Sequence, residues 1–352
     1  MLKESLLLLS ESATARKVIT RAPVSRSLAM RFVAGDTLED AVQAARALNA
    51  ANLSVSLDFL GESVKTRDEA EAATAMVIRI LETIARTGID ANVSVKPTQF
   101  GLDLDEAFCR SNIELVLQRA RELGDGEGEV FVRLDMESSD YTARTVDLLE
   151  GLWNDGFHNT GTVLQSYLRR TPGDLERLIA LGSRIRLVKG AYKEPAEVAF
   201  EDKADVDRMY VDEMERLLEA GHYPAIATHD EAIIDHARRF VWEKGIGKES
   251  FEFQMLYGVR RDLQTRLREE GYNVRVYVPF GDSWYPYLMR RLAERPANVI
   301  FMAGNILKES GAGRFLNPAA IGAGIVAGAA GALAWRGRGR KRKHTTKSRR
   351  RR

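Results

Sequence analysis

The sequence predicts an α/β protein folded as a (β/α)8 TIM barrel and preceded by N-terminal helices. Short β-rich runs alternate with longer helical patterns, which is typical of parallel strands joined by crossover helices. Eight such units follow one another over about 230 residues, the usual size of this barrel. A doubly wound sheet is the competing arrangement. It usually has about six strands, so the eightfold repeat favours closure.

The predicted strands are short runs rich in Val, Leu, Ile and Phe. In chain order they cover residues 53–61, 91–101, 129–136, 162–168, 184–192, 223–230, 251–258 and 274–281. Stretches such as RDEAEAATAMVIRILETIART lie between them, with apolar residues every three or four positions. We therefore expect an N-terminal segment of two or three helices, a catalytic barrel and a tail, over residues 1–50, 51–310 and 311–352.

Composition limits the classes of protein that the chain can belong to. Its 352 residues are 45% hydrophobic and 29% charged, which suits a large folded core. Cys109 is the only cysteine, which excludes an intrachain disulfide and a multi-cysteine metal site and favours a reducing, cytoplasmic setting. The start of the chain, MLKESLLLLSESATARKV, is typical of an amphipathic helix rather than a signal peptide.

Familiar catalytic and nucleotide-binding motifs are missing. The sequence contains no P-loop, no HExxH, no CxxC and no convincing serine nucleophile elbow, so we predict no metal site. AIGAGIVAGAAGALAW, residues 320–335, resembles a dinucleotide-binding turn. A Rossmann motif needs a second strand and a later acidic residue, however, and only a basic tail follows.

Polar residues gather where the predicted strands end, and active sites of (β/α)8 barrels lie there. One such residue is most often satisfied by structure alone, but a polar group at nearly every strand end favours a ligand site. These residues are Glu62, Lys96, Gln99, Asp135, Glu137, Gln165, Arg186, Lys189, Tyr192, Thr228, His229, Gln254 and Tyr277.

A helix expected near residues 284–295 carries two adjacent arginines. Tyr287 with Arg291, and Arg290 with Glu294, are spaced four residues apart, so all four side chains can share one broad face. An ordinary solvated helix with ion pairs has the same pattern.

Seven ordered motifs over about residues 30–307 resemble the monofunctional proline dehydrogenase family. They are DFLGE, VSVKPTQFG, RLDME, RLVKGAYKEP, ATHD, FEFQMLYG and YLMRRLAERPAN. The resemblance implies a distorted barrel whose last helix lies over the barrel mouth. It also implies hydride transfer from L-proline to FAD, giving 1-pyrroline-5-carboxylate for another enzyme, with electrons passed to a membrane quinone.

The resemblance also assigns roles to individual residues. Lys96, Arg290 and Arg291 would bind the proline carboxylate, and guanidinium groups suit a carboxylate because they bind it bidentately. Asp135 would brace Tyr277, Glu294 would balance the arginine-rich helix, and Glu62 would form an ion-pair gate with Arg290. Ala191, Tyr192, Leu256, Tyr277 and Tyr287 would wall the pyrrolidine ring.

The flavin contacts implied by the resemblance all come from the barrel. Arg186 would lie near flavin N5, Gln165 at the pyrimidine edge, and Gly190 would permit close backbone approach. The full set is Met136, Gln165, Arg186, Val188, Lys189, Gly190, Ala191, Thr228, His229, Gln254 and Glu294.

The tail differs in charge from the rest of the chain. Residues 336–352 contain eight Arg and three Lys and no acid, leaving 41 basic and 50 acidic residues elsewhere. The uncharged stretch 315–335 is long enough to span a membrane but only weakly apolar. Peripheral contact of residues 315–352 with anionic lipid at the inner face of the cell membrane fits better. A spanning helix and a solvated tail are the alternatives.

Two other functions stay open. Another flavin-dependent barrel, such as a folate-linked reductase, would also use acidic and glutamine side chains at strand ends. From a different class, the basic tail alone suits a polyanion-binding protein. The acidic body lacks a mixed basic and aromatic surface, so we expect no specific nucleic acid.

Overall fold

The structure is a computed structural model that describes residues 20, 23–61, 64–124 and 129–294. The chain divides into two compact units. One covers residues 30–284, and the other is formed by residues 1–29 and 285–352.

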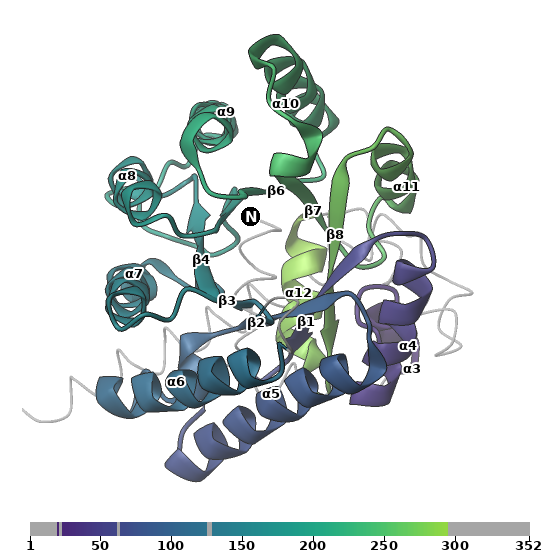
Figure 1. Cartoon of the computed structure of the whole chain (residues 1–352), viewed down its shortest axis with the longest axis vertical. Coiled ribbons are helices and arrows are strands. Elements are labelled where there is room, and N and C mark those ends of the chain that lie inside the picture. The colour runs from purple at the N-terminus through teal and green to yellow at the C-terminus, as the bar shows by residue number, and fades with distance from the viewer. Residues whose placement is uncertain (1–19, 21–22, 62–63, 125–128, 295–352) are drawn as a thin grey trace, which may run out of the picture. The chain divides into compact units, whose positions relative to one another are not determined.

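The larger unit is a closed barrel of eight parallel strands in chain order, as predicted (Figure 1). β8 pairs with β1, with Val276 aligned to Val55, and this pairing closes the barrel. The strands are β1 Ser54–Phe59, β2 Ala91–Val95, β3 Val132–Leu134, β4 Thr160–Gln165, β5 Ile185–Val188, β6 Ala225–Ala227, β7 Glu252–Leu256 and β8 Asn273–Phe280. Most are shorter than the predicted runs because the last residues of those runs form loops.

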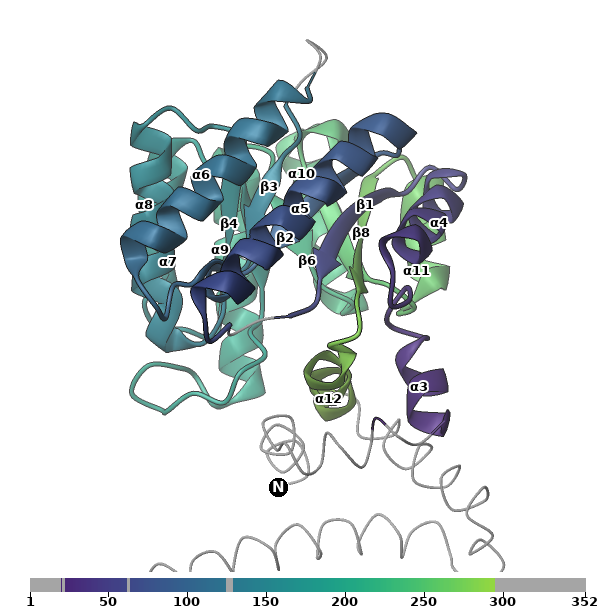
Figure 2. The ribbon, with the colours of Figure 1, turned by 90° about the horizontal axis from the view of Figure 1, so that it is seen from below.

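Helices surround the strands, and Figure 2 shows α5 and α6 along one side of the barrel. The crossover helices are α5 Arg67–Thr87, α6 Glu106–Glu122, α7 Ser139–Asn154, α8 Thr171–Leu181, α9 Lys203–Ala220, α10 Glu231–Lys244 and α11 Arg261–Glu269. Two short 3-10 helices, η1 Pro97–Phe100 and η2 Lys248–Ser250, follow β2 and precede β7.

One further helix, α4 Leu38–Asn49, packs against β8 and β1. In a regular barrel, the helix that follows the last strand covers this seam. Here a helix from before the first strand covers it, so the N-terminal region completes the ring of helices.

Local sequence fixes the ends of these helices. The Thr66 hydroxyl accepts from the Glu69 N–H, and the Glu69 carboxylate accepts from the Thr66 N–H, which forms a capping box at the start of α5. The helix ends at Gly88, in the left-handed conformation that suits glycine.

The strands separate two environments. Alternate residues such as Val55 and Leu57 are fully buried in the apolar layer between strands and helices. The residues between them, Ser56 and Asp58, belong to a buried polar network with the other strands inside the barrel. The apolar layer holds the barrel together, and the interior is left for polar chemistry.

The second unit contains α3 Pro23–Ala29 and, at the end of the described chain, all of α12 Trp284–Glu294 except its first residue. The helix expected near residues 284–295 is therefore confirmed. Its expected place over the barrel mouth stays a prediction. No helix in the described ranges is long and apolar enough to cross a membrane.

Candidate active site

Arg186 is the centre of a buried network inside the barrel. It lies within β5, not after it as predicted, and its side chain is 5% exposed. Its Nη1 donates to Asp135 Oδ1 at 2.7 Å, and its Nη2 donates to Ser94 Oγ at 3.0 Å. The Tyr277 hydroxyl donates to Asp135 Oδ2 at 2.8 Å, so the brace expected between these residues is present.

A second ion pair is formed by Lys96 and Asp58. The Lys96 Nζ atom lies 3.0 Å from Asp58 Oδ1, and both side chains are buried. Burial raises the pKa of Asp58, and the nearby Lys96 charge opposes that rise without cancelling it. The backbone at Lys96 is also fixed, because its N–H donates to Gln99 Oε1 at 2.9 Å.

A deeper polar layer lies on the same strands. The Gln254 amide contacts both Arg186 and Glu252, and Glu252 pairs with Arg275 at 3.0 Å. Arg133 donates through Nη1 to the carbonyl oxygens of Thr162 and Arg184, both at 3.0 Å. Burial, and then repulsion from Arg186, hold the pKa of Arg133 well below its usual value.

The loop after β5 has a close backbone approach. Gly190 has φ +113°, and a Cβ at this position would lie 2.3 Å from the Tyr167 ring. The Glu194 carboxylate anchors the loop, since it accepts from the Ser139 N–H at 2.8 Å and from the Tyr167 hydroxyl at 3.3 Å. Ala191 and Tyr192 lie between these anchors and are half-buried.

The Lys189 ammonium is already paired. It lies 2.6 Å from Asp207 Oδ1 and 3.0 Å from Asp230 Oδ2. These carboxylates hold its charge at the start of the loop, and its expected cofactor contact stays a prediction.

The other expected flavin contacts also lie at strand ends. The Gln165 Nε2 atom donates to the Glu137 carbonyl at 2.8 Å, which leaves its Oε1 directed to accept. His229 Nε2 accepts from the Leu256 N–H at 2.9 Å, so Nδ1 carries the proton of the neutral ring. Gln165, Val188 and Leu256 end their strands, and Met136, Thr228 and His229 follow theirs within two residues.

Some predicted site residues are not part of the barrel network. Glu62, the expected gate, lies outside the described residues. Tyr287, Arg290, Arg291 and Glu294 are on α12, in the second unit. Within that helix the Arg291 guanidinium lies 5.2 Å from the centre of the Tyr287 ring, as their four-residue spacing allows.

Sequence reasoning missed Asp58 and the deeper layer of Glu252, Arg275 and Arg133. The sequence does mark these residues, because polar and apolar residues alternate along the strands and each of these polar residues has an apolar residue on both sides. In NVRVYVPF, for example, Arg275 and Tyr277 alternate with three valines.

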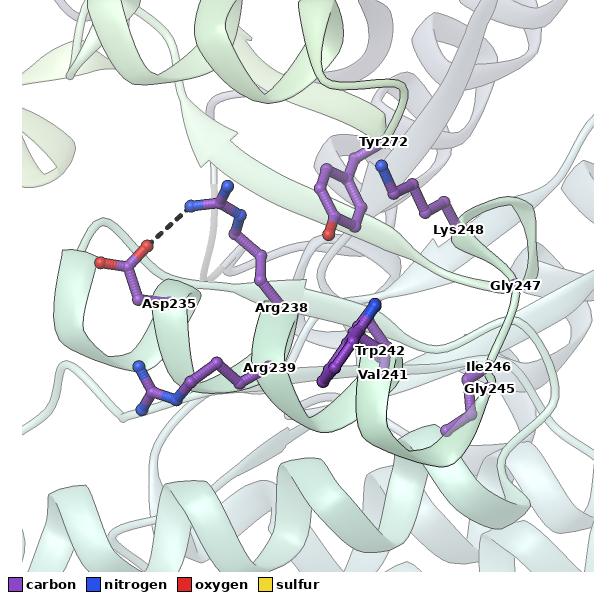
Figure 3. A pocket seen from close by; sticks show the side chains of 10 residues that line it. All are labelled: Asp235, Arg238, Arg239, Val241, Trp242, Gly245, Ile246, Gly247, Lys248 and Tyr272. Carbon is purple, nitrogen blue, oxygen red and sulfur yellow. Dashed lines mark hydrogen bonds and ion pairs between the residues drawn. The ribbon is translucent and has the colours of Figure 1, made fainter.

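The structure also has a surface pocket of about 750 Å³ away from this network (Figure 3). Residues at the end of α10 line it together with η2 and Tyr272, and Trp242 is 82% exposed there. Its Arg238 pairs with Asp235 at 2.9 Å, and Figure 3 marks this ion pair with a dashed line. None of its lining residues lies at the carboxyl end of a strand, so the interior network is the better candidate active site. Among the described residues, no acidic, His and Cys cluster could hold a metal ion.

Charged side chains gathered inside a closed parallel barrel and at its strand ends place the protein in the class of (β/α)8 barrel enzymes. The family model for proline dehydrogenase matches residues 41–304. The chain belongs to the proline dehydrogenase family.

Individual relatives agree with this family. The chain is 44% identical to the proline dehydrogenase of Deinococcus radiodurans over 286 residues, covering 80% of this chain and 91% of that protein. It is 40% identical to proline dehydrogenase 2 of Bacillus subtilis over 307 residues, with 87% and 99% coverage. Proline utilization A from Bdellovibrio bacteriovorus, in a crystal structure inactivated by N-propargylglycine, shares the fold. Its TM-score is 0.73 at 23% identity, covering 91% of this chain and 39% of that chain.

Proposed function

We propose that this protein is an FAD-dependent proline dehydrogenase that oxidises L-proline to 1-pyrroline-5-carboxylate. The observation that carries the proposal is the buried Arg186–Asp135–Tyr277 network in a chain of this family. The network supplies a fixed cation and a fixed phenol where barrel enzymes carry out their chemistry.

The residues at the strand ends fit an isoalloxazine ring. Gly190 has no side chain to enter the site from the loop after β5, Arg186 offers a buried cation, and Gln165 Oε1 offers an acceptor to a ring N–H. When bound, FAD accepts the hydride from substrate. A guanidinium held by Asp135 and Ser94 needs no rearrangement to stabilise the negative charge that the ring then gains.

Substrate would be held by its carboxylate. Lys96 is the barrel residue that we assign to this task, with Arg290 and Arg291 of α12 as its partners. A carboxylate bound by fixed cations has one orientation, which directs the ring toward the hydride acceptor. Tyr277, Tyr287, Tyr192, Ala191 and Leu256 would pack on the ring and exclude water.

An absorption spectrum of the purified protein, recorded without oxygen before and after L-proline, tests this proposal. We expect flavin bands that bleach when L-proline is added. Flavin bands that persist would keep a flavin barrel but exclude proline, and would favour the folate-linked reductase. A protein that takes up no flavin would contradict both assignments.

Electrons would then pass to a membrane quinone. We propose that the protein is cytoplasmic and that residues 315–352 hold it on anionic lipid at the inner face of the membrane. The uncharged stretch and the eleven basic residues after it support this proposal. Full-length protein should bind vesicles containing anionic lipid better than a chain ending at Ser310. Equal binding would exclude the membrane contact.

A further inference from the structure

The orientation of the Gln254 amide is dictated by its two neighbours. Its Oε1 accepts from Arg186 Nε at 2.5 Å, and its Nε2 donates to Glu252 Oε1 at 2.5 Å. An arginine only donates hydrogen bonds and an ionised carboxylate only accepts them. A reversed amide would therefore place N–H against N–H and oxygen against oxygen, so Glu252 and Arg186 together permit one orientation.

Glu252 is itself fixed by Arg275, on the neighbouring strand β8. Both of its oxygens lie within 3.1 Å of Arg275 Nε, and Arg275 Nη1 donates to the Val55 carbonyl at 2.8 Å. Burial favours a higher pKa for Glu252, but Arg275, the Gln254 amide and Arg133 outweigh it and hold the pKa below its usual value. The carboxylate therefore stays ionised and keeps accepting at neutral pH.

These contacts form one continuous chain through the barrel, from Arg275 through Glu252 and Gln254 to Arg186. Arg186 has four side-chain partners, and together they use all three nitrogens: Gln254 at Nε, Asp135 at Nη1, and both Ser94 and Ser56 at Nη2. Partners at all three nitrogens fix the plane of the guanidinium group, whereas partners at Nη1 and Nη2 alone leave it free to tilt about the line that joins those two atoms. The Gln254 anchor is the one that depends on Glu252.

We propose that Glu252 and Arg275 are a positioning pair, which orients Arg186 toward the flavin ring through the Gln254 amide. The inference rests on the proposed function, because Arg186 needs this orientation only if a flavin ring binds next to it. Neither residue of the pair is assigned a contact with flavin or substrate, so each acts through Gln254.

The direction in which the flavin midpoint potential shifts in Glu252→Gln distinguishes a positioning role of Glu252 from a direct effect of its charge. Glu252→Gln removes a negative charge from the barrel interior. If only the charge mattered, its loss would stabilise the reduced flavin ring, which carries negative charge, and the flavin midpoint potential would rise. If Glu252 positions Arg186, the amide of Gln254 can turn, Arg186 loses an anchor, and the potential falls instead.

We would measure the flavin midpoint potential of the purified, flavin-loaded full-length protein. For Glu252→Gln we expect the equilibrium for reduction to weaken about tenfold, which for a two-electron couple is a fall of about 30 mV. Glu252→Asp keeps the charge and withdraws the carboxylate by one methylene. Positioning predicts a similar fall, and a through-space effect predicts no change.

Glu213→Gln is the control for the substitution itself, because it also replaces a buried glutamate by glutamine, on α9 outside the network. Its potential should equal that of the unchanged protein. A rise in Glu252→Gln, or an unchanged potential in Glu252→Asp, would overturn the positioning role. Failure of the unchanged protein to bind flavin, or to bleach with L-proline, would instead overturn the proposed function.

Discussion

The Tyr277 hydroxyl donates a hydrogen bond to Asp135 Oδ2 at 2.8 Å, while the other oxygen of the same carboxylate accepts from Arg186 at 2.7 Å. One carboxylate thus joins side chains of β5 and β8. Burial, and then the Asp135 charge, raise the pKa of Tyr277 well above its usual value. The phenol therefore stays protonated and can only donate to Asp135.

Tyr277→Phe removes this donor and leaves the Arg186–Asp135 pair in place. A hydrogen bond to a charged group contributes about 1.5–3 kcal/mol, so we expect kcat/KM for L-proline to fall about tenfold or more. The flavin spectrum should stay the same, because the flavin-facing cation keeps its partner.

Tyr210→Phe is the control for this substitution. Tyr210 is also buried and donates to the Leu187 carbonyl at 3.2 Å, on the side of β5 that faces α9. It should lower the melting temperature with little change in kcat/KM. Equal loss of kcat/KM in both variants would mean that Tyr277 acts only through stability.

Arg291→Met tests the assignment of the proline carboxylate to α12. Methionine keeps an unbranched apolar stem beside the Tyr287 ring but removes the guanidinium, with its donors and its contact over that ring. We expect KM for L-proline to rise at least about tenfold with flavin still bound. Unchanged KM would exclude Arg291 from the substrate site.

The fold was predictable because the sequence repeats one pattern eight times. A run of apolar residues followed by polar ones marks the end of a strand, and this placed Lys96, Asp135 and Gln165 correctly. The pairing of Lys189 with Asp207 and Asp230 was not predictable, because those partners are 18 and 41 residues away along the chain. The alternation of polar and apolar residues within strands marks the residues of the deeper layer but not their burial, since a charged residue within a strand usually faces solvent.

Glu213 makes stability depend on pH. It is 3% exposed, and neither of its carboxylate oxygens has a hydrogen-bond partner among the described residues. Burial, and then the Asp212 charge, raise the pKa of Glu213 from 4.5 to about 8. The folded chain therefore binds one more proton than the unfolded chain between these values. Stability from this group is complete below pH 4.5 and is lost as pH rises through 8.

Glu213→Gln should remove that pH dependence. Since each pKa unit corresponds to about 1.4 kcal/mol, the variant should be more stable at pH 9 by an amount on the order of a few kcal/mol. At pH 4.5 the two proteins should be nearly equal, because the native carboxyl is then protonated when folded. Urea unfolding at both pH values measures the difference. An equal gain at both would show that charge is not the cause.

Glu194 should control the mobility of the loop after β5. Glu194→Ala removes the acceptor for the Ser139 N–H and the Tyr167 hydroxyl. We expect trypsin to cleave after the exposed Lys193 several-fold faster, because proteolysis follows local opening of the chain. Glu197→Ala, an exposed position in the same loop, is the control and should leave the rate unchanged. Equal rates in both variants would exclude anchoring by Glu194.

Gly190 has a backbone conformation that residues with a side chain adopt only with strain. Its φ of +113° is strained for any residue with a side chain, and a Cβ would overlap the Tyr167 ring at 2.3 Å. Gly190→Ala should therefore displace the loop that follows β5. We expect a lower melting temperature and less flavin retained after gel filtration, because the same loop carries the close approach assigned to the cofactor.

Gly173→Ala is the matched control, in the first turn of α8. A Cβ there meets nothing within 4 Å, and its φ is not in the positive range. Alanine favours a helix over glycine by about 0.5–1 kcal/mol, so this variant should be slightly more stable and keep its flavin. If Gly190→Ala kept full flavin content while losing stability, the glycine would serve the packing of Tyr167 alone. If it lost flavin with an unchanged melting temperature, the close approach at Gly190 would be reserved for the cofactor.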